Sequence, residues 1–431
     1  MKFHLISLGC PKNTVDSEDV VATLTRQGLT WVGTPEQADL VLLNTCGFIR
    51  DAKEESLRHV FQLLELKKAR PRLRVAVFGC LVQRYQEELR REIPEIDHLF
   101  TFFDKTSLSA LVKGLARRAG GVRPETPARR FLTPNHVGFL KIAEGCSNRC
   151  SYCTIPDIRG PFRPRPLDEV LRDAEVLVRT GARELSIMAQ DTAGYGVPTR
   201  NKELLLELVR KVGEFPTVHW IRLHYLHPRH LDFPFLDALF SLPKVVPYFD
   251  IPFQHVSDRL LALMNRAVTK RQIIDLLRHI RGTFKRSVVR TTFIVGFPGE
   301  SEEEFEELID FIEDHPIDRL GAFPYSHEEG TPAARLRPRI RAAEKSRRLD
   351  QLMTAQQLLS FDRNNKKIGK IDEILIDKAD ASGLVGRTYG DAFEVDNAVH
   401  VPYDATVQPG DFIKVRFTGA DAYDLEAERV L

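Results

Sequence analysis

Six cysteines with distinctive spacing are the residues of this chain best suited to chemistry, and they form two groups of three. Cys146, Cys150 and Cys153, the loop trio, are close enough in sequence for one tight loop to direct three thiolates at one point. Three thiolates can hold a cubic iron–sulfur cluster and leave its fourth iron without a protein ligand. That iron can chelate the amino and carboxylate groups of S-adenosylmethionine (SAM), whose reductive cleavage gives a 5′-deoxyadenosyl radical.

A zinc site is the alternative interpretation of the loop trio. Zinc sites are commonly built from paired Cys-x-x-Cys knuckles, or completed by a distant histidine or another cysteine. One loop with three cysteines directly after a predicted strand suits an iron–sulfur cluster better. We therefore predict a cluster with an open iron at the loop trio.

Cys10, Cys46 and Cys80, the sheet-edge trio, are separated by 36 and 34 residues, about one strand-plus-helix unit each. Each directly follows an apolar run and has a glycine beside it. The carboxyl ends of neighbouring parallel strands meet at one edge of a sheet, so these thiols are expected to converge. The adjacent glycines would permit close backbone approach to a second cluster. The alternative is three separate core cysteines.

An open parallel α/β domain over residues 1–118 would position the sheet-edge trio. Apolar runs alternate there with segments of helical periodicity, as in parallel sheets with crossover helices. The predicted strands are 3–8, 38–44 and 75–78, and the predicted helices are 17–27, 53–67 and 83–92. A segment rich in glycine and proline at 119–134 is predicted to be a linker.

A partial (βα)6 barrel over residues 135–340 would position the loop trio. Its predicted strands are 139–143, 184–189, 219–223, 246–250, 288–295 and 321–325. Its predicted helices are 168–179, 201–212, 258–265, 270–281 and 302–314. Residues 341–368 are predicted to form a connecting helix, regular over 341–365.

The last part of the chain, residues 369–431, is predicted to be a small OB-like β-barrel of five strands. Strand-like pieces at 371–376, 383–387, 406–407 and 412–418 are separated by glycine and proline. This segment has 13 acidic and 6 basic residues, a net charge of −7, whereas the preceding 368 residues carry +9.

The composition is that of a globular protein with more than one domain. The chain has 431 residues, of which 43% are hydrophobic and 28% are charged. These values exclude a disordered tail, a collagen and a small disulfide scaffold. The sequence has no apolar run near the length of about 20 residues that spans a bilayer and no secretory signal, so we expect a cytoplasmic protein without a membrane partner.

The spacing C-x-x-x-C-x-x-C of the loop trio is the radical SAM signature, and the whole chain resembles the methylthiotransferases of that superfamily. Stretches at 7–17, 190–196, 250–258 and 325–333 are similar to the RimO branch. His327 departs from that pattern, where proline is expected, and Thr192-Ala193 is a smaller variation.

The resemblance implies that the terminal barrel is a TRAM domain and that the chain holds two 4Fe–4S clusters. The second cluster would supply or carry sulfur, which one SAM methylates while another SAM provides the radical. RimO-like enzymes modify the β-carbon of an aspartate in ribosomal protein S-twelve. The alternatives are a MiaB-like enzyme acting on a tRNA adenosine and, outside the class, a non-catalytic zinc- or RNA-binding module.

The resemblance also implies a set of residues around SAM. They are Tyr152, Gln190, Gln254, Gly296 and Glu300.

Radical chemistry removes the need for a general base at an aspartate β-carbon, so no catalytic residue is expected beyond the cluster ligands. His255 is the nearest candidate for a polar contact, or else a structural histidine. Arg159 or Arg163 is a candidate to hold the substrate carboxylate.

The charge distribution favours a basic protein as the principal partner. An acidic terminal barrel repels RNA and attracts a cationic ribosomal protein. Basic stretches at 113–118 and 363–367 are candidates for secondary contact with ribosomal RNA. The resemblance implies an electron donor such as flavodoxin or ferredoxin, and nothing in the sequence requires more than a monomer.

Overall fold

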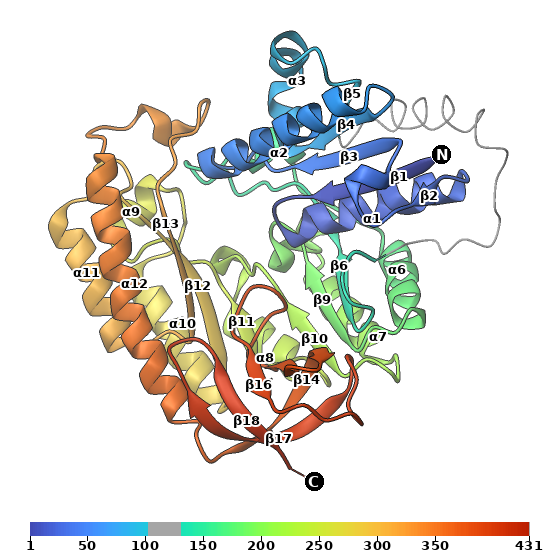
Figure 1. Ribbon diagram of the computed structural model, residues 1–431. Coiled ribbons are helices and arrows are strands. Elements are labelled where there is room, and N and C mark those ends of the chain that lie inside the picture. Colours follow the sequence, from blue (N-terminus) through green and yellow to red (C-terminus); the bar gives the residue numbers. More distant parts are fainter. Residues whose placement is uncertain (102–130, 431) are drawn as a thin grey trace.

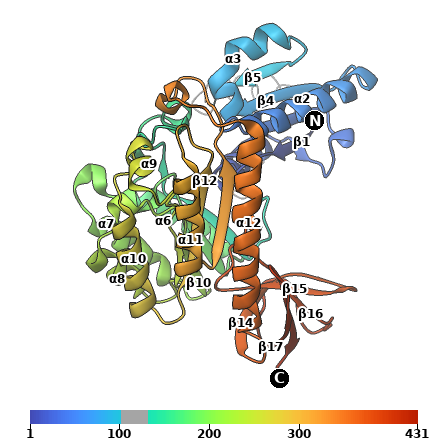
Figure 2. The same cartoon turned by 90° about the vertical axis from the view of Figure 1, so that its left-hand side faces the viewer.

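The computed structural model describes residues 1–101 and 131–430, which form three parts that follow one another along the chain (Figure 1). An α/β sheet comes first (blue), a larger α/β layer follows (green to orange), and a small β-barrel ends the chain (red). Figure 2 shows α12 (Ala342–Asn365) running along the larger layer to the small barrel. Within the described ranges no helix has the length and apolar character needed to cross a membrane.

The first part is a five-stranded parallel sheet in the order β2-β1-β3-β4-β5. Its strands are β1 (Lys2–Ser7), β2 (Thr30–Trp31), β3 (Leu40–Thr45), β4 (Arg74–Gly79) and β5 (His98–Phe100). Its helices are α1 (Pro11–Arg26), α2 (Arg50–Ala69) and α3 (Cys80–Glu92). Every residue of β3 is buried, because α1 packs on one face of the sheet and α2 and α3 pack on the other. The predicted open parallel domain is confirmed.

The second part is a partial barrel of six parallel strands in two sheets, β6-β9-β10 and β11-β12-β13. Its strands are β6 (Val137–Lys141), β9 (Glu184–Met188), β10 (Trp220–Leu223), β11 (Tyr248–Asp250), β12 (Val288–Val295) and β13 (Arg319–Pro324). A parallel bridge between Ile221 and Val245 joins the two sheets. The predicted (βα)6 arrangement is therefore confirmed.

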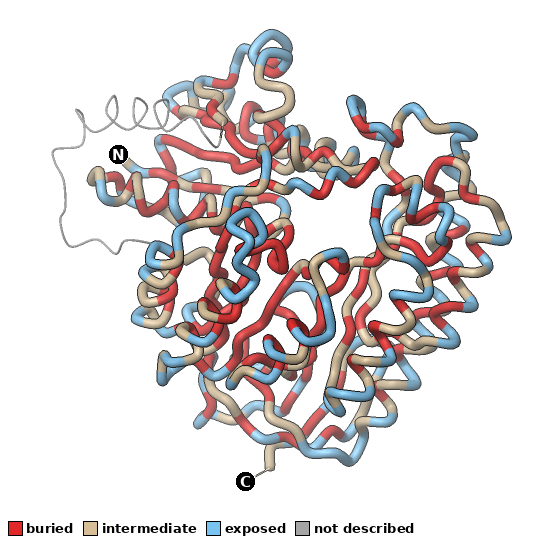
Figure 3. Tube along the Cα trace, turned by 180° about the vertical axis from the view of Figure 1, so that it is seen from behind, coloured by how far each residue is buried: buried red, intermediate tan, exposed pale blue. Residues whose placement is uncertain are grey.

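Helices cover the outside of this barrel and bury one face each. They are α6 (Leu167–Arg179), α7 (Glu203–Gly213), α8 (Phe233–Phe240), α9 (Asp258–Leu263), α10 (Lys270–Thr283) and α11 (Glu302–Asp314). Their inner residues form one apolar core with the strands. Figure 3 shows the result, with mostly buried strands and with helices that alternate between buried and exposed residues. The sequence analysis missed α8.

The third part is a closed barrel in the order β14-β15-β16-β18-β17. Its strands are β14 (Ile371–Asp380), β15 (Gly383–Thr388), β16 (Val399–Val401), β17 (Phe412–Ala420) and β18 (Leu425–Arg429). Glu184, the first residue of β9, accepts hydrogen bonds from Arg222 (2.7 Å) and Arg387 (2.8 Å) in the buried interface with the larger barrel. The small barrel is thus attached at the amino ends of the larger barrel's strands.

Some elements differ from the sequence-based predictions, and some predicted segments lie outside the described residues. The strand predicted at 406–407 is wrong: these residues lie in a turn region, and β16 and β18 complete the barrel instead. The short edge strands β2 and β5 were not predicted, because two or three residues are too few to show an alternating or continuous apolar pattern. Most of the predicted linker, 119–130, and the basic stretch 113–118 lie outside the described residues.

Candidate functional site

The sheet-edge trio lies at the carboxyl ends of three adjacent parallel strands. Cys10 immediately precedes α1, which follows β1. Cys46 directly follows β3, and Cys80 directly follows β4 as the first residue of α3. Because β1, β3 and β4 are neighbours in the sheet, their three loops meet at one edge.

Glycines beside these cysteines let the three loops pack tightly. A Cβ atom on Gly9 (φ +89°) would lie 3.0 Å from Cys46 Cβ, and one on Gly79 (φ +107°) would lie 2.4 Å from Asn44 Oδ1. A Cβ on Gly47 would lie 2.7 Å from the backbone at the start of α3. We expected these glycines to make room for a cluster; in the structure each makes room for a neighbouring loop.

A buried asparagine ties the loops together. Asn13 Nδ2 donates to the carbonyl oxygens of Leu8 (2.9 Å) and Thr45 (3.3 Å). Its Oδ1 accepts from Arg159 Nη2 (2.6 Å) and lies 3.7 Å from Cys80 Sγ. Asn13 therefore links the loops after β1 and β3 to the third cysteine.

In the sheet-edge trio Cys80 is buried and Cys10 and Cys46 are half-buried, and their thiols act on one another electrostatically. Burial raises the pKa of Cys80 to about 12, which the nearby Arg159 opposes and the thiols of Cys46 and Cys10 reinforce. Burial also raises the pKa of Cys46. Without a metal the thiols of Cys46 and Cys80 stay protonated, and iron binding would replace their protons because only thiolates ligate metals.

The loop trio lies between β7 (Ala143–Glu144) and α5 (Ile155–Arg159), at the carboxyl end of the partial barrel. The Cys146 N–H donates to the Gly160 carbonyl (3.1 Å), and the Cys153 N–H donates to the Cys150 carbonyl (3.0 Å). The backbone N–H and hydroxyl of Ser151 bond to carbonyl oxygens at the end of α9 (3.0 and 2.7 Å). These bonds fix a compact loop that carries all three thiols.

The loops that carry the two trios touch each other. Thr154, next to the loop trio, donates from Oγ1 to the carbonyl of Phe48, two residues after Cys46 (3.5 Å). Arg159, at the end of α5, places Nη2 3.8 Å from Cys80 Sγ. The segments that carry the two trios are therefore in contact where the first sheet meets the partial barrel.

Arg159 is the centre of a buried ionic network across this interface. Its guanidinium bonds to Asp16 (2.8 Å) and Glu144 (2.9 Å), and only 1% of the residue is exposed. Lys141 also contacts both carboxylates. Burial by itself would raise the pKa of Glu144, but Lys141 and Arg159 outweigh it and hold that pKa at about 2. Arg159 is thus already bound to carboxylates of the protein itself.

A second ionic contact joins the same two parts. Glu328, which is 1% exposed, accepts from Lys53 on α2 (2.8 Å) and Arg84 on α3 (2.8 Å). Arg84 also donates to the carbonyl of Gly47, beside the sheet-edge trio (2.7 Å). Glu328 belongs to the stretch at 325–333 that resembles the RimO branch, so that stretch holds the first sheet against the barrel.

Removing the Arg159 side chain should strongly destabilise the contact between the two parts. In Arg159→Ala the carboxylates of Asp16 and Glu144 lose a cationic partner in a buried site. Removing one partner of a buried ion pair lowers the free energy of unfolding by about 3–5 kcal/mol. Urea unfolding of the cluster-free protein measures the effect. The exposed Arg91, paired with Glu92, gives the matched control Arg91→Ala, which should leave stability unchanged. Equal stability of both variants would contradict this assignment.

A single metal ion and an iron–sulfur cluster require different spacings of their thiol ligands. Around one zinc ion, four ligands converge at about 2.0–2.3 Å. Within the described ranges no three side chains of His, Cys, Asp or Glu are grouped tightly enough to hold a single metal ion. In a cluster each thiolate ligates a different iron, so the thiols stand farther apart.

Two of the predicted SAM contacts lie beside the loop trio or at the open end of the barrel. Gln190 follows β9, and neither polar atom of its buried amide has a hydrogen-bond partner among the described residues. An unsatisfied buried amide favours a missing ligand. Tyr152 is half-buried and packs against the apolar group that contains Met264 and Phe297. Both assignments stay predictions.

The other three predicted contacts have visible structural roles. Gln254 adopts φ +78° after β11. At Gly296 (φ +69°) a Cβ atom would lie 2.4 Å from Lys345 Cγ, so glycine lets α12 pack there. Glu300 accepts from the Phe297 N–H (2.8 Å) and pairs with α12. Their contacts with SAM remain predictions.

The remaining predicted polar residues lie away from free space or at the surface. His255 is fully buried, accepts from the Ser257 N–H (3.0 Å), and has a pKa lowered to about 3 by burial, so it is neutral. Its buried Nε2 has no hydrogen-bond partner among the described residues, as in Gln190, so the polar contact of His255 stays a prediction. Arg163 is exposed on β8 (Arg163–Pro164).

Sequence analysis missed a buried arginine beside the loop trio. Arg266 is 3% exposed and places Nη1 3.4 Å from Cys150 Sγ and 2.7 Å from His227 Nε2. Burial lowers the pKa of His227 to about 2, and Arg266 acts in the same direction. Neutral His227 therefore accepts from Arg266 and aims the guanidinium at the thiol.

Sequence analysis also missed Lys12, a buried lysine beside the sheet-edge trio. Lys12 is 8% exposed and places Nζ 3.5 Å from the centre of the Tyr225 ring. Among the described residues no carboxylate lies within ion-pair distance of it. Burial raises the pKa of Tyr225, and the nearby Lys12 opposes that rise. The position of Lys12 two residues after Cys10 was the available signal.

Models of known families match the three parts in turn. Residues 2–101 match the family described as uncharacterized protein family UPF0004, residues 140–312 match the radical SAM superfamily, and residues 368–430 match the TRAM domain.

Curated relatives match over the full length. The chain is 41% identical over 433 residues to ribosomal protein uS12 methylthiotransferase RimO of Thermosipho africanus, covering 100% of both chains. It is 40% identical to the protein of the same name from Clostridioides difficile, covering 99% of this chain and 98% of the relative. Among solved structures, the radical SAM methyltransferase TsrM of Kitasatospora setae has a similar fold, with a TM-score of 0.55 and 14% identity over 77% of this chain and 76% of that one.

Proposed function

The chain belongs to the radical SAM methylthiotransferase family, in its RimO branch, and we propose that it inserts a methylthio group at the β-carbon of an aspartate in ribosomal protein uS12, the S-twelve protein of the small subunit. Membership of the radical SAM superfamily implies SAM and one 4Fe–4S cluster. The observation that supports the proposal is the contact between the segments that carry the two trios, with Arg159 of α5 3.8 Å from Cys80 Sγ.

The loop trio would hold the SAM-binding cluster, and the sheet-edge trio would hold a second 4Fe–4S cluster with one open iron. When bound, these groups supply a radical able to abstract an unactivated hydrogen and a sulfur atom that accepts a methyl group. The protein supplies the thiols and the buried cations beside them. Arg266 beside Cys150 and Arg159 beside Cys80 place one guanidinium at each trio.

Lys12 is the residue that we assign to the substrate carboxylate. An aspartate entering between the two trios must exchange its hydration for a hydrogen-bonded cation, since an unpaired buried charge is very costly. Arg159 is already bound to Asp16 and Glu144, whereas the described residues offer Lys12 no carboxylate. Its ammonium group lies on the Tyr225 ring, and Lys12 is two residues after Cys10 in the first turn of α1, on the side of the sheet-edge trio where the substrate β-carbon would need to be.

The terminal barrel would guide the substrate protein. Its net charge of −7 contrasts with the basic composition of ribosomal proteins, and opposite charges accelerate encounter. At physiological salt the effect acts within about 8 Å of the surface. An electron donor of the flavodoxin or ferredoxin class would deliver the electrons that SAM cleavage consumes.

Mass spectrometry of uS12 tests the proposed function directly. Anaerobically reconstituted enzyme, SAM, a reductant and a uS12 peptide should give the peptide plus one methylthio group on its aspartate. In cells, deletion of the gene should remove this modification from uS12 and leave tRNA nucleosides unchanged. A lost tRNA methylthio group with unchanged uS12 would identify a tRNA enzyme and contradict the proposal.

A further inference from the structure

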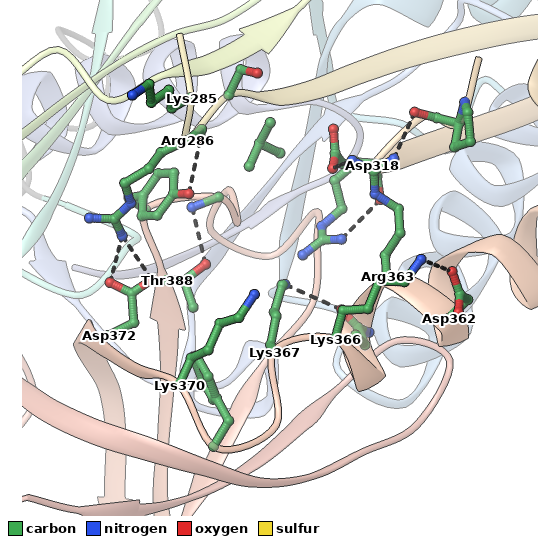
Figure 4. Close-up of a pocket in the computed structure, with 18 of the residues that line it drawn as sticks. Lys285, Arg286, Asp318, Asp362, Arg363, Lys366, Lys367, Lys370, Asp372 and Thr388 are labelled. Carbon is green, nitrogen blue, oxygen red and sulfur yellow. Dashed lines mark hydrogen bonds and ion pairs between the residues drawn. The ribbon is translucent and has the colours of Figure 1, made fainter. Parts of the chain in front are cut away.

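A large cavity lies at the opposite end of the molecule from the cysteines. Its volume is about 620 Å³, and it opens between the floor of the partial barrel, the end of α12 and the first strand of the terminal barrel (Figure 4). Val288, the first residue of β12, and Arg319, the first residue of β13, lie on its wall. The trios lie beyond the carboxyl ends of the strands, so the cavity belongs to a different site.

Positive charge dominates the wall of this cavity. Seven basic residues line it: Lys285, Arg286, Arg319, Arg363, Lys366, Lys367 and Lys370. Three acidic residues, Asp318, Asp362 and Asp372, also line it, which leaves a net charge of +4.

The acidic residues are already paired, as the dashed lines of Figure 4 indicate. Asp372 accepts two hydrogen bonds from Arg286 (2.7 and 2.8 Å). Asp318 pairs with Arg363 (2.6 Å), and Asp362 pairs with Lys366 (2.5 Å). The surplus of +4 therefore belongs to Arg319, which pairs with Asp391 outside the wall (2.5 Å), and to three remaining lysines.

Those lysines come from two segments of the chain, and in the described ranges none has a carboxylate within ion-pair distance. Lys285 precedes β12, Lys367 follows α12, and Lys370 precedes β14. Lys367 Nζ donates to the amide oxygen of Asn364 (3.3 Å), another residue of the wall. Burial lowers the pKa of Lys367 and of Arg363, so an anion in the cavity would stabilise both charges.

We propose that this cavity binds phosphate groups of an RNA backbone, and specifically of the ribosomal RNA around uS12, the latter resting on the proposed function. Phosphate neutralisation by lysine and arginine dominates RNA affinity. Cations on two separate segments suit successive phosphates, and lysine binds phosphate as a point charge, whereas arginine binds through a planar fork. The volume is within the range that accepts a nucleotide-sized group.

This site would give a ribosomal substrate a second point of attachment. The acidic surface of the terminal barrel attracts a basic protein, whereas the basic cavity beside it attracts the RNA in which that protein is embedded. Two linked contacts strengthen binding more than either alone, because the second forms at a high local concentration.

The test measures binding of a short fluorescein-labelled RNA hairpin to the reconstituted full chain by anisotropy. The variant Lys285→Gln/Lys367→Gln/Lys370→Gln should bind at least about tenfold more weakly, and its plot of log affinity against log salt should be shallower by about two. The control Lys2→Gln/Lys378→Gln/Lys414→Gln removes the same charge from exposed positions outside the cavity and should bind like wild type.

Two outcomes would overturn the proposal: equal RNA binding by the cavity variant and wild type, or binding of tripolyphosphate in the cavity with no binding of RNA. Both triple variants should methylthiolate a free uS12 peptide at the wild-type rate, because the cavity is remote from the trios. If wild type fails to modify that peptide but still binds RNA through the three lysines, the proposed function fails and the cavity assignment stands.

Discussion

Cys10→Ala should reduce methylthiolation of a uS12 peptide by at least about 100-fold, while SAM cleavage continues near the wild-type rate. Cys10 belongs to the sheet-edge trio, which would carry the sulfur, and the loop trio remains intact in this variant. A three-thiolate cluster that loses a ligand is no longer held in place. Chromatography of 5′-deoxyadenosine and mass spectrometry of the peptide measure the two activities in one reaction.

Cys150→Ala is the matched variant in the loop trio. It should lose both activities, because the cluster that binds SAM would lose a ligand. Continued methylthiolation by Cys10→Ala would contradict the division of work between the trios. Equal loss of SAM cleavage in both variants would also contradict it.

Lys12→Met should lower kcat/KM for the uS12 peptide on the order of 100-fold, because a hydrogen bond to a charged group is worth about 1.5–3 kcal/mol. SAM cleavage without peptide should be unchanged. The variant should also lose preference for the natural peptide over one in which the target aspartate is replaced by asparagine. Competition between the two peptides, followed by mass spectrometry, measures this preference directly.

Lys2→Met is the control for the loss of a lysine. Lys2 is exposed at the start of β1, in the same α/β part of the chain as Lys12. Tyr225→Phe keeps the ring on which Lys12 lies and should retain most activity. An unchanged ratio of aspartate to asparagine peptide in Lys12→Met would remove Lys12 from substrate recognition.

The sequence was most informative where local pattern and burial coincide. Strands such as β3 and β4 are covered on both faces, so they appear as continuous apolar runs, and a cysteine directly follows each. The parallel order of the sheet then brings Cys46 and Cys80 to one edge. Short strands such as β16 and β18 depend on pairing with distant segments, which leaves no periodic pattern.

Contacts between the parts of the chain could not be predicted in this way. Asn13 and Arg159 are 146 residues apart, and Lys53 and Glu328 are 275 residues apart. Arg159 was expected to face the substrate, yet it bonds to two carboxylates of its own chain. Such roles depend on how two separately recognisable domains face each other.

Iron and sulfide analysis, with Mössbauer spectra, of the anaerobically reconstituted protein is the most direct test of the central claim. The account predicts about eight irons per chain for wild type, as two 4Fe–4S clusters, and about four when alanine replaces either the whole sheet-edge trio or the whole loop trio. A wild-type chain with four irons, or one that holds zinc at either trio, would contradict it.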